Sequence, residues 1–204
     1  MKPQIYTIGY TGFSIEEFID VLQRYNINVV IDVRSFAYSE RYPDYNKNVL
    51  NELLKRNKIY YRNYISEFGA RQEDTKFYTS EGYLDFELFA KSKQFLSGVQ
   101  RIENSVAQGY KIVFLCAEKD PTQCHRTILV SRAFSDKGYP IIHLLPNGNI
   151  ETQKGIEQKW LDKFYPSRSQ MDMFSGGKSD EEYIAEIYRE QNKKIGYKIE
   201  EEEE

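Results

Sequence analysis

The sequence of 204 residues is long enough for one hydrophobic core with an extension, because a typical domain spans about 100–200 residues. Hydrophobic residues make up 40% of the chain, and a mean hydropathy of −0.66 indicates a strongly polar surface. No apolar run approaches the roughly 20 residues of a membrane-spanning helix, and the first residues lack a signal-peptide pattern. Two cysteines are too few for a disulfide framework. We therefore expect a cytoplasmic protein with reduced thiols and no membrane contact.

The charge of the chain is distributed unevenly along the sequence. Residues 180–204 carry ten acidic and four basic side chains, a net charge of −6, within a whole-chain net charge of −3. The preceding residues 1–179 therefore carry +3. A mildly basic body permits a polyanionic partner such as nucleic acid, without requiring one.

Predicted strands and helices alternate along most of the chain. Residues 4–8 form an apolar run that ends at Gly9, and a capping box at Ser14 and Glu17 starts an amphipathic helix. Residues 28–33 are predicted as a second strand, in which Val29-Val30-Ile31 are apolar on consecutive positions, as in a strand covered on both faces. Further strands are predicted at residues 59–64, 111–115 and 139–145, and further helices around residues 49–54, 86–106, 125–137 and 156–164. This alternation predicts an α/β protein with a mainly parallel sheet and helices on both faces.

The C-terminal part of the chain reads as an extension of this α/β domain. We expect the domain to span residues 1–165, followed by a Ser/Gly-rich linker at 166–179 and an amphipathic helix with an acidic tail at 180–204. Ser179 and Glu182 mark the start of that helix. The closing run of glutamates is expected to be solvated.

Polar residues follow four of the predicted strands, where the strands end. They are Thr7 to Tyr10, Asp32 to Arg34, Cys116 to Glu118, and His143. In parallel sheets, ligands bind beyond the carboxyl ends of the strands. We therefore expect these four groups to converge on one site.

Both cysteines and both histidines of the chain lie between residues 116 and 143. Cys124 is expected at the N-terminus of a helix, where the positive potential lowers the pKa of a thiol and favours the thiolate. Cys124 is therefore the expected nucleophile and should be more reactive than Cys116. Glu118 and Asp32 are the candidates for general acid or base, so the predicted catalytic residues are Cys124, Glu118, Asp32 and Cys116.

A second set of residues is predicted to bind an anionic substrate. Arg126 and His125 share the expected helix N-terminus with Cys124, and a guanidinium suits phosphate or carboxylate. The predicted binding set is Gly9, Tyr10, Arg34, Arg41, His125 and Arg126. Tyrosines alternate with basic residues beyond Arg34 and would suit base stacking, but half-buried packing is the favoured interpretation there.

Two other interpretations of the Cys/His stretch remain. The four side chains of Cys116, Cys124, His125 and His143 are suitable zinc ligands, but the gap between the cysteines is longer than usual, and adjacent Cys124 and His125 would be strained. We therefore predict no metal, and the sequence specifies no cofactor. Alternatively, both cysteines are small packing residues, since buried cysteine is common.

With these residues described, the chain resembles the uncharacterised family known as domain of unknown function 488. The resemblance covers about residues 4–145 and implies a compact α/β domain with no assigned activity. It rests on Thr7-Ile8-Gly9-Tyr10, Asp32-Val33-Arg34, Ser39 with Arg41, Phe68-Gly69, Cys116-Ala117-Glu118 and Cys124-His125-Arg126. Two departures concern Ala37 to Arg41, where the family pattern is similar to Pro-x-Ser-Arg, and Gly69-Ala70 in place of Gly-Gly.

The predicted linker contains a second motif, Gln170-Met171-Asp172-Met173-Phe174. This segment resembles the peptides by which bacterial replication and repair proteins dock on the DNA polymerase sliding clamp. Such peptides use a glutamine and apolar anchors on a flexible segment. Alternatively, Met171, Met173 and Phe174 pack back on the body.

Taken together, these patterns predict an enzyme or binding protein that acts on nucleic acid or a nucleotide-like phosphate compound, with DNA maintenance as the expected setting. The alternatives are a non-catalytic module that docks on replication or repair partners, and a zinc-stabilised structural domain. The sequence specifies neither the substrate nor the reaction.

Overall fold

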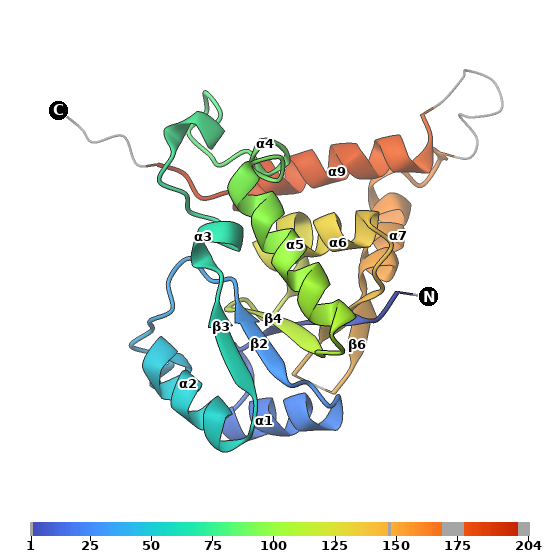
Figure 1. Ribbon diagram of the computed structural model, residues 1–204. Helices are drawn as coiled ribbons and strands as arrows, with labels where there is room; N and C mark the ends of the chain where they lie inside the picture. Colours follow the sequence, from blue (N-terminus) through green and yellow to red (C-terminus); the bar gives the residue numbers. More distant parts are fainter. Residues whose placement is uncertain (1, 147, 169–177, 200–204) are drawn as a thin grey trace.

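A computed structural model describes residues 2–146, 148–168 and 178–199 of the chain (Figure 1). Within these ranges six strands form one sheet in the order β3-β2-β4-β1-β5-β6. The strands are β1 (Ile5–Gly9), β2 (Val29–Asp32), β3 (Tyr60–Asn63), β4 (Ile112–Cys116), β5 (Ile141–Leu144) and β6 (Ile150–Thr152). Neighbours pair in parallel except β5 and β6, which are antiparallel. The predicted mainly parallel α/β sheet is confirmed.

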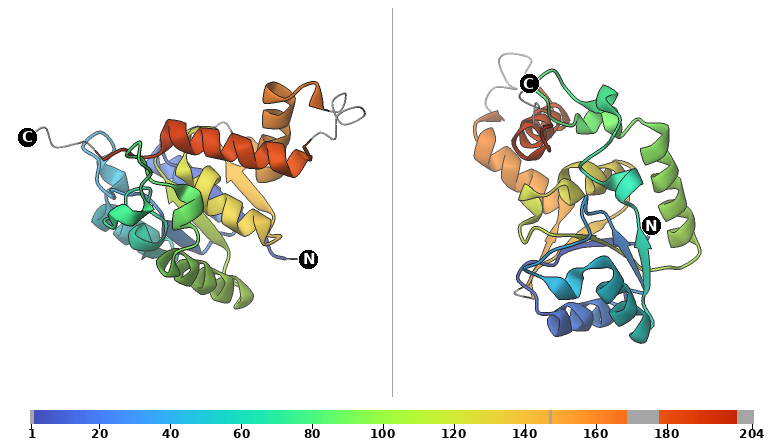
Figure 2. Two further views of the ribbon diagram at one scale, coloured as in Figure 1. Left: turned by 90° about the horizontal axis from the view of Figure 1, so that it is seen from above. Right: turned by 90° about the vertical axis from the view of Figure 1, so that its left-hand side faces the viewer.

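Helices cover both faces of the sheet, as predicted (Figures 1 and 2). One face carries α1 (Ile15–Arg24) and α2 (Lys47–Arg56). The other face carries α3 (Ile65–Phe68), α4 (Phe86–Phe89), α5 (Lys93–Ala107), α6 (Arg132–Asp136), α7 (Gln153–Phe164) and α9 (Asp180–Ile195). Short 3-10 turns at Pro43–Tyr45, Thr75–Phe77 and Pro121–Gln123 complete the connections, with a π-helix, η4 (Arg126–Ser131). No helix in the described ranges combines the length and apolarity needed to cross a membrane.

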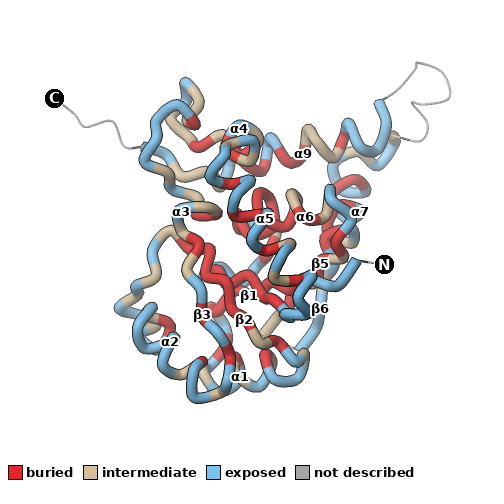
Figure 3. Tube along the Cα trace, in the orientation of Figure 1, coloured by how far each residue is buried: buried red, intermediate tan, exposed pale blue. Residues whose placement is uncertain are grey.

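The side-chain alternation of the strands divides the core into two clusters. In β4, Val113 and Leu115 face the cluster that contains residues of α1 and α2, whereas Ile112, Phe114 and Cys116 face the cluster beneath α5, α6 and α9. Every residue of β4 is buried, which explains its continuous apolar sequence (Figure 3). Cys116 therefore ends β4 on the same side as α5 and α9.

The predicted capping boxes are present at two helices. Ser14 Oγ accepts a hydrogen bond from the Glu17 amide at 3.2 Å, and Glu17 Oε2 accepts one from the Ser14 amide at 2.8 Å. Ser179 and Glu182 form the same reciprocal pair at the start of α9. These local bonds satisfy amides that no helical carbonyl can reach.

The prediction of one long helical region over residues 86–106 is wrong. The structure has α4 and α5, separated by a turn in which Ser92 Oγ accepts a hydrogen bond from the Phe95 amide at 3.1 Å. Ser92 thus starts a new helix. The new start changes the buried face, so that Phe95 is buried and Leu96, predicted to face inward, is half exposed.

The segment after Cys124 also differs from the predicted α-helix. It forms η4 and then the short α6, and ends near Gly138, which adopts φ +84° as expected of a glycine after a helix. Within η4 the carbonyl of Thr127 accepts a hydrogen bond from the side-chain amide of Gln153 at 3.3 Å. This partner comes from α7, so the local sequence pattern carried no signal for it. π-turns of this kind occur frequently at functional sites.

The C-terminal helix packs on the α/β body. In α9, Tyr183, Ile187 and Tyr188 are buried and belong to the same cluster as α5 and α6. The segment after α9 then runs beside residues 82–84, where the Leu84 amide donates to the Tyr197 carbonyl at 3.2 Å. Residues near the end of the described chain are thereby brought next to the carboxyl edge of the sheet. The antiparallel β6, only three residues long, was not predicted.

Candidate functional site

A hollow of about 390 Å³ lies at the carboxyl edge of the sheet. The loops after β1, β2 and β4 meet there because these strands are close neighbours in the sheet. Five of the predicted site residues line it: Tyr10, Arg34, Cys116, Glu118 and His125. The remaining lining includes Phe36, Tyr38, Arg71, Gln123, Ile195 and Tyr197, none of which the sequence reasoning selected.

The two thiols share one carboxylate. Cys116 ends β4, and Cys124 follows the 3-10 turn at Pro121–Gln123. Their sulfur atoms lie 3.0 and 2.8 Å from the same oxygen of Glu118, Oε2. Both cysteines are buried and reduced. A carboxylate that contacts two thiols can accept a proton from either of them.

His125 completes the cluster. Its Nε2 lies 2.8 Å from the carbonyl oxygen of Val33, at the end of β2, and since a carbonyl only accepts, Nε2 carries a hydrogen. The other ring nitrogen, Nδ1, lies 3.7 Å from the sulfur of Cys116. The carbonyl of Val33 thus orients the imidazole so that Nδ1 faces the thiols.

The surroundings of the two thiols shift their pKa values in opposite directions. Burial by itself would raise the pKa of Cys124. The hydrogen bond from Cys116 and the positive charge of Arg126 oppose burial and bring this pKa down to about 6. Burial and the neighbouring Cys124 instead raise the pKa of Cys116. Cys124 therefore carries the thiolate, and Cys116 remains a protonated donor to it.

The carboxylate and the imidazole adjust to this thiolate. Burial alone would raise the pKa of Glu118, but its close contacts with the sulfur atoms of Cys124 and Cys116 and the charge of His125 lower it, so the side chain is ionised. Burial would lower the pKa of His125, but its hydrogen bond to Cys124 and the negative charge there raise it. The result is a buried pair of a thiolate and a protonated imidazole.

Arg126 fastens the loop that carries Glu118 and is closed off from the hollow. It is completely buried, its Nη1 donates to the carbonyl of Glu118, and its Nη2 lies 3.4 Å from the carbonyl of Lys119. Among the described residues no carboxylate pairs with its guanidinium, and its Nε has no partner. The thiolate of Cys124 is the natural counter-charge for this buried cation. Predicted to bind substrate, Arg126 instead has its donors directed at the loop.

Gly9 permits the close approach of this loop. A Cβ atom at Gly9 would lie 1.7 Å from the carbonyl oxygen of Glu118 and 2.5 Å from Nη1 of Arg126. Next along the chain, the Tyr10 amide donates to the Cys116 carbonyl at 3.1 Å. The loops after β1 and β4 are therefore in backbone contact, which only glycine allows here.

Asp32 and Arg34 form a buried ion pair in the wall of the hollow. Asp32 accepts from the Arg34 Nε at 2.8 Å, from the Arg34 amide at 3.1 Å and from the Tyr61 hydroxyl at 2.5 Å, and Arg34 Nη2 forms the ion pair at 2.5 Å. Arg34 also donates to the Tyr45 carbonyl at 2.8 Å. With these bonds Asp32 is fully occupied and does not line the hollow. This geometry favours a positioning role for Asp32 over the predicted acid/base role.

Arg41 lies outside the lining of the hollow. It is exposed, with its guanidinium carbon 5.5 Å from the centre of the Tyr42 ring. The neighbouring Ser39 accepts from the Tyr42 amide and its own amide donates to Asn46, so the segment after Arg34 is held in a turn.

His143 does not join this edge, and the expectation that it would is wrong. Its Nδ1 lies 2.7 Å from the Thr7 hydroxyl and its Nε2 lies 3.0 Å from Oε1 of Gln153 in α7. Burial and the charge of Arg126 lower the pKa of His143 to about 3, so it is neutral. The side chains of Thr7 in β1 and His143 in β5 both point to the face of the sheet that α7 covers, as the alternation of side chains along a strand requires. Thr7 and His143 thus hold α7 to the sheet.

Three of the four candidate zinc ligands do come together. The ligand atoms of Cys116, Cys124 and His125 all lie within 4.8 Å of one another. Two thiolates and an imidazole suit a thiophilic ion. The fourth candidate, His143, is committed to Thr7 and Gln153, so the four-ligand set is not assembled.

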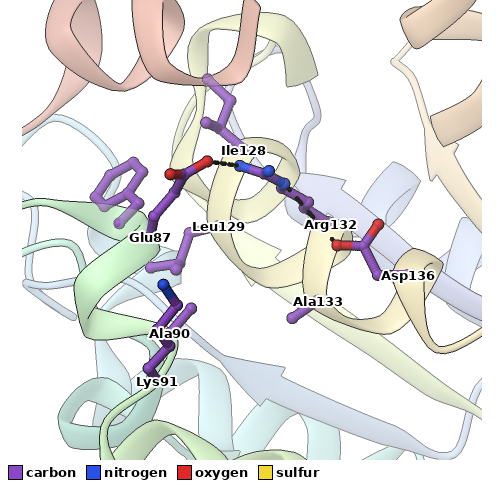
Figure 4. A pocket seen from close by; sticks show the side chains of 9 residues that line it. Glu87, Ala90, Lys91, Ile128, Leu129, Arg132, Ala133 and Asp136 are labelled. Atoms are coloured by element: carbon purple, nitrogen blue, oxygen red, sulfur yellow. Dashed lines mark hydrogen bonds and ion pairs between the residues drawn. The ribbon is translucent and has the colours of Figure 1, made fainter. Parts of the chain in front are cut away.

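A second hollow, of about 310 Å³, lies where α4 faces η4 and α6 (Figure 4). Three of its charged side chains pair with one another: Arg132 lies 3.1 Å from Glu87 and 3.9 Å from Asp136. No cysteine or histidine lines it. The chemistry of the described residues is therefore concentrated at the carboxyl edge of the sheet.

The fold and the site define the class of protein. It is an α/β domain with a mainly parallel sheet, and thiol, carboxylate and imidazole groups cluster at the carboxyl edge of that sheet. The chain belongs to the family described as Domain of unknown function DUF488, whose family model matches residues 14–133, more than half of the chain. That range includes Asp32 and the segment from Cys116 to Arg126, but ends before Tyr197. Neither the curated proteins nor the solved structures that were compared give a match.

Proposed function

We propose that the protein is an enzyme of the cytoplasm that uses the thiolate of Cys124 on a phosphate-bearing, nucleotide-like compound. The observation that carries the proposal is the convergence of Cys116, Glu118, Cys124 and His125 beside an open hollow. An ionised thiol paired with an imidazole and contacted by a carboxylate is a typical arrangement for nucleophilic catalysis. Thiols used only for packing need none of these partners.

In the proposed reaction each partner has one task. The sulfur of Cys124 bonds to the electrophilic atom of the substrate, and the bond to the leaving group breaks with its electron pair on that group. His125 then gives the leaving group the proton of Nδ1. Glu118 positions the two cysteines through the contacts of its Oε2 with both sulfur atoms, and Cys116, which stays protonated, belongs to the lining of the hollow whereas Cys124 does not.

Alkylation of the thiols tests this assignment. The rate of alkylation by iodoacetamide should rise with pH and level off above a midpoint near pH 6, because the thiolate reacts and the pKa of Cys124 is lowered to about 6. Mass spectrometry should find the label on Cys124. Zinc analysis of the same sample should find no stoichiometric metal. Preferential labelling of Cys116, or labelling of neither thiol, contradicts Cys124 as the nucleophile.

Two single substitutions serve as matched variants. Cys116→Ala removes a hydrogen bond that lowers the pKa of Cys124, so the midpoint should move to higher pH while the label stays on Cys124. Cys124→Ala leaves Cys116 alone with a pKa that burial raises, so labelling at pH 7 should nearly disappear. A nucleoside monophosphate that occupies the hollow should slow labelling of the wild type.

We also propose that residues 170–174 dock on the DNA polymerase sliding clamp. They lie outside the described residues, so support comes from the sequence alone, in which a glutamine precedes apolar anchors. A pull-down with the clamp should recover the wild type and lose the Gln170→Ala/Phe174→Ala double variant, because a short peptide depends on few anchors. Equal recovery of both proteins, or recovery of neither, excludes this docking.

A further inference from the structure

Arg71 lies between two aromatic rings at the hollow. Its guanidinium carbon is 3.9 Å from the centre of the Tyr197 ring and 4.5 Å from the centre of the Phe36 ring. All three residues line the hollow, and each comes from a different part of the chain: the loop after β2, the segment after α3, and the segment after α9. Both rings lie within cation–π distance of the guanidinium, whose edge carries the N–H donors.

Among the described residues, no carboxylate pairs with the guanidinium of Arg71. Arg34 is paired with Asp32, and Arg126 is bonded to backbone carbonyls. In the described part of the chain, Arg71 makes neither a hydrogen bond nor an ion pair, although its side chain is exposed at the hollow. Its donors are therefore free to bind an anion.

Acidic residues near Arg71 do not neutralise it. Glu67, Glu73 and Asp74 line a neighbouring hollow that Arg71 also borders. Glu67 is paired with Arg101, and Asp74 is paired with Lys76. None of the three carboxylates lies within ion-pair distance of Arg71 in the described chain, so the guanidinium keeps its full charge for a ligand.

The main chain at Tyr197 is held by hydrogen bonds to the segment at residues 82–84. The Leu84 amide donates to the carbonyl of Tyr197 at 3.2 Å, and the Ile199 amide donates to the carbonyl of Gly82 at 2.9 Å. These two bonds fix the backbone of the segment after α9 at Tyr197 and two residues beyond it. The guanidinium is thus oriented before any ligand arrives, which reduces the entropy lost on binding.

We propose that Arg71, which lies against the rings of Phe36 and Tyr197, binds the phosphate group of the substrate in the hollow at the carboxyl edge of the sheet. The inference rests on the proposed function for the identity of the hollow as the reaction site. A planar guanidinium with free edge donors matches two phosphate oxygens at once, which an ammonium group cannot do. The ligand class is a phosphate ester, either a free nucleotide or the terminal phosphate of a nucleic acid strand.

Binding of phosphate esters to the full-length protein tests the inference. Titration calorimetry with a nucleoside monophosphate should show an affinity about tenfold or more weaker for Arg71→Gln, since a charged hydrogen-bond pair is lost. Arg71→Lys should fall between Arg71→Gln and the wild type, because it keeps the charge and loses the fork. Arg62→Gln is the matched control: Arg62 is also exposed and stacked on a ring, Tyr60, but does not line the hollow.

The outcomes are separable. Unchanged binding by Arg71→Gln, or equal loss in Arg71→Gln and Arg62→Gln, overturns the inference, since the second result would mean general charge attraction. Phosphate binding that depends on Arg71 in a protein whose thiols are not labelled would sink the proposed enzyme alone. Labelling near pH 6 without Arg71-dependent binding would sink the inference alone.

Comparison of three probes distinguishes the two sources of phosphate. A 5′-phosphorylated oligonucleotide, its unphosphorylated counterpart and the free nucleoside monophosphate are titrated separately. A terminal phosphate of a strand as ligand predicts that the phosphorylated strand, like the monophosphate, loses affinity in Arg71→Gln relative to the wild type, and that the unphosphorylated strand does not. A free nucleotide as ligand predicts that the monophosphate shows this loss and neither strand does. Identical loss for both strands would contradict recognition of a phosphate ester end.

Discussion

Asp32→Asn is expected to lower the free energy of unfolding by about 3–5 kcal/mol, because it removes one member of a fully buried ion pair. The guanidinium of Arg34, only 3% exposed, would keep its charge with no carboxylate beside it. The hydroxyl of Tyr61 would lose its charged acceptor as well. Urea denaturation followed by circular dichroism measures the effect.

Asp136→Asn provides the matched control, with the same chemical change in an exposed pair. Asp136 lies 3.9 Å from Arg132 and its side chain is 64% exposed. Exposed ion pairs contribute about 0–1 kcal/mol, so the loss should be much smaller. If the two variants lose the same stability, the Asp32–Arg34 pair does not support the wall of the hollow in the way that its burial suggests.

Gly9→Ala is expected to damage both stability and thiol chemistry. The new Cβ would overlap the carbonyl of Glu118, a backbone atom that cannot swing aside, so the loop that carries Glu118 must move. Overpacking of this kind costs about 3 kcal/mol. Displacement of Arg126 with the loop weakens the charge that lowers the pKa of Cys124, so the alkylation midpoint should rise from near 6.

Gly155→Ala tests whether any added methyl group has this effect. There the close atoms are a carboxylate oxygen of Glu151 at 2.6 Å and the hydroxyl oxygen of Thr152 at 2.9 Å, both at the ends of side chains and not in the backbone. Gly155 lies in α7, where alanine is also the better helix former. A stability near that of the wild type, with the midpoint still near pH 6, is expected. A wild-type midpoint in Gly9→Ala would show that the contact with Glu118 does not position the thiols.

Local sequence patterns predicted most of the fold. The spacing of apolar residues, the capping residues and the alternation of strands with helices predicted the sheet, the helices on both of its faces and the C-terminal helix. They failed where a tertiary contact decides the local structure. The carbonyl of Thr127 bonds to Gln153, from a distant helix, within a segment whose sequence reads as an ordinary α-helix. Ser92 was a readable capping signal that the continuous apolar pattern obscured.

The part of the site whose residues lie close together in the sequence could be predicted, and the part that comes from distant segments could not. Cys116, Glu118, Cys124 and His125 lie within one short stretch, and the structure brings all four together. The sequence could not distinguish arginines that build the site from those that face it. Arg34 is paired with Asp32, and Arg126 is bonded to the carbonyls of Glu118 and Lys119, whereas Arg71 was overlooked because the rings beside it come from the loop after β2 and the segment after α9.

Tyr197 is synthesised after the other residues that line the hollow. Almost the whole sequence separates Tyr197 from Tyr10, yet both line the same hollow. A ribosome delivers the N-terminal strands and the thiol loop first, and domains begin to fold in that order. The two cysteines are therefore synthesised before the last wall of the hollow exists, and Arg71 has only the ring of Phe36 beside it until α9 has docked. The nascent chain has its reactive thiols earlier than the complete hollow that would select a ligand for them.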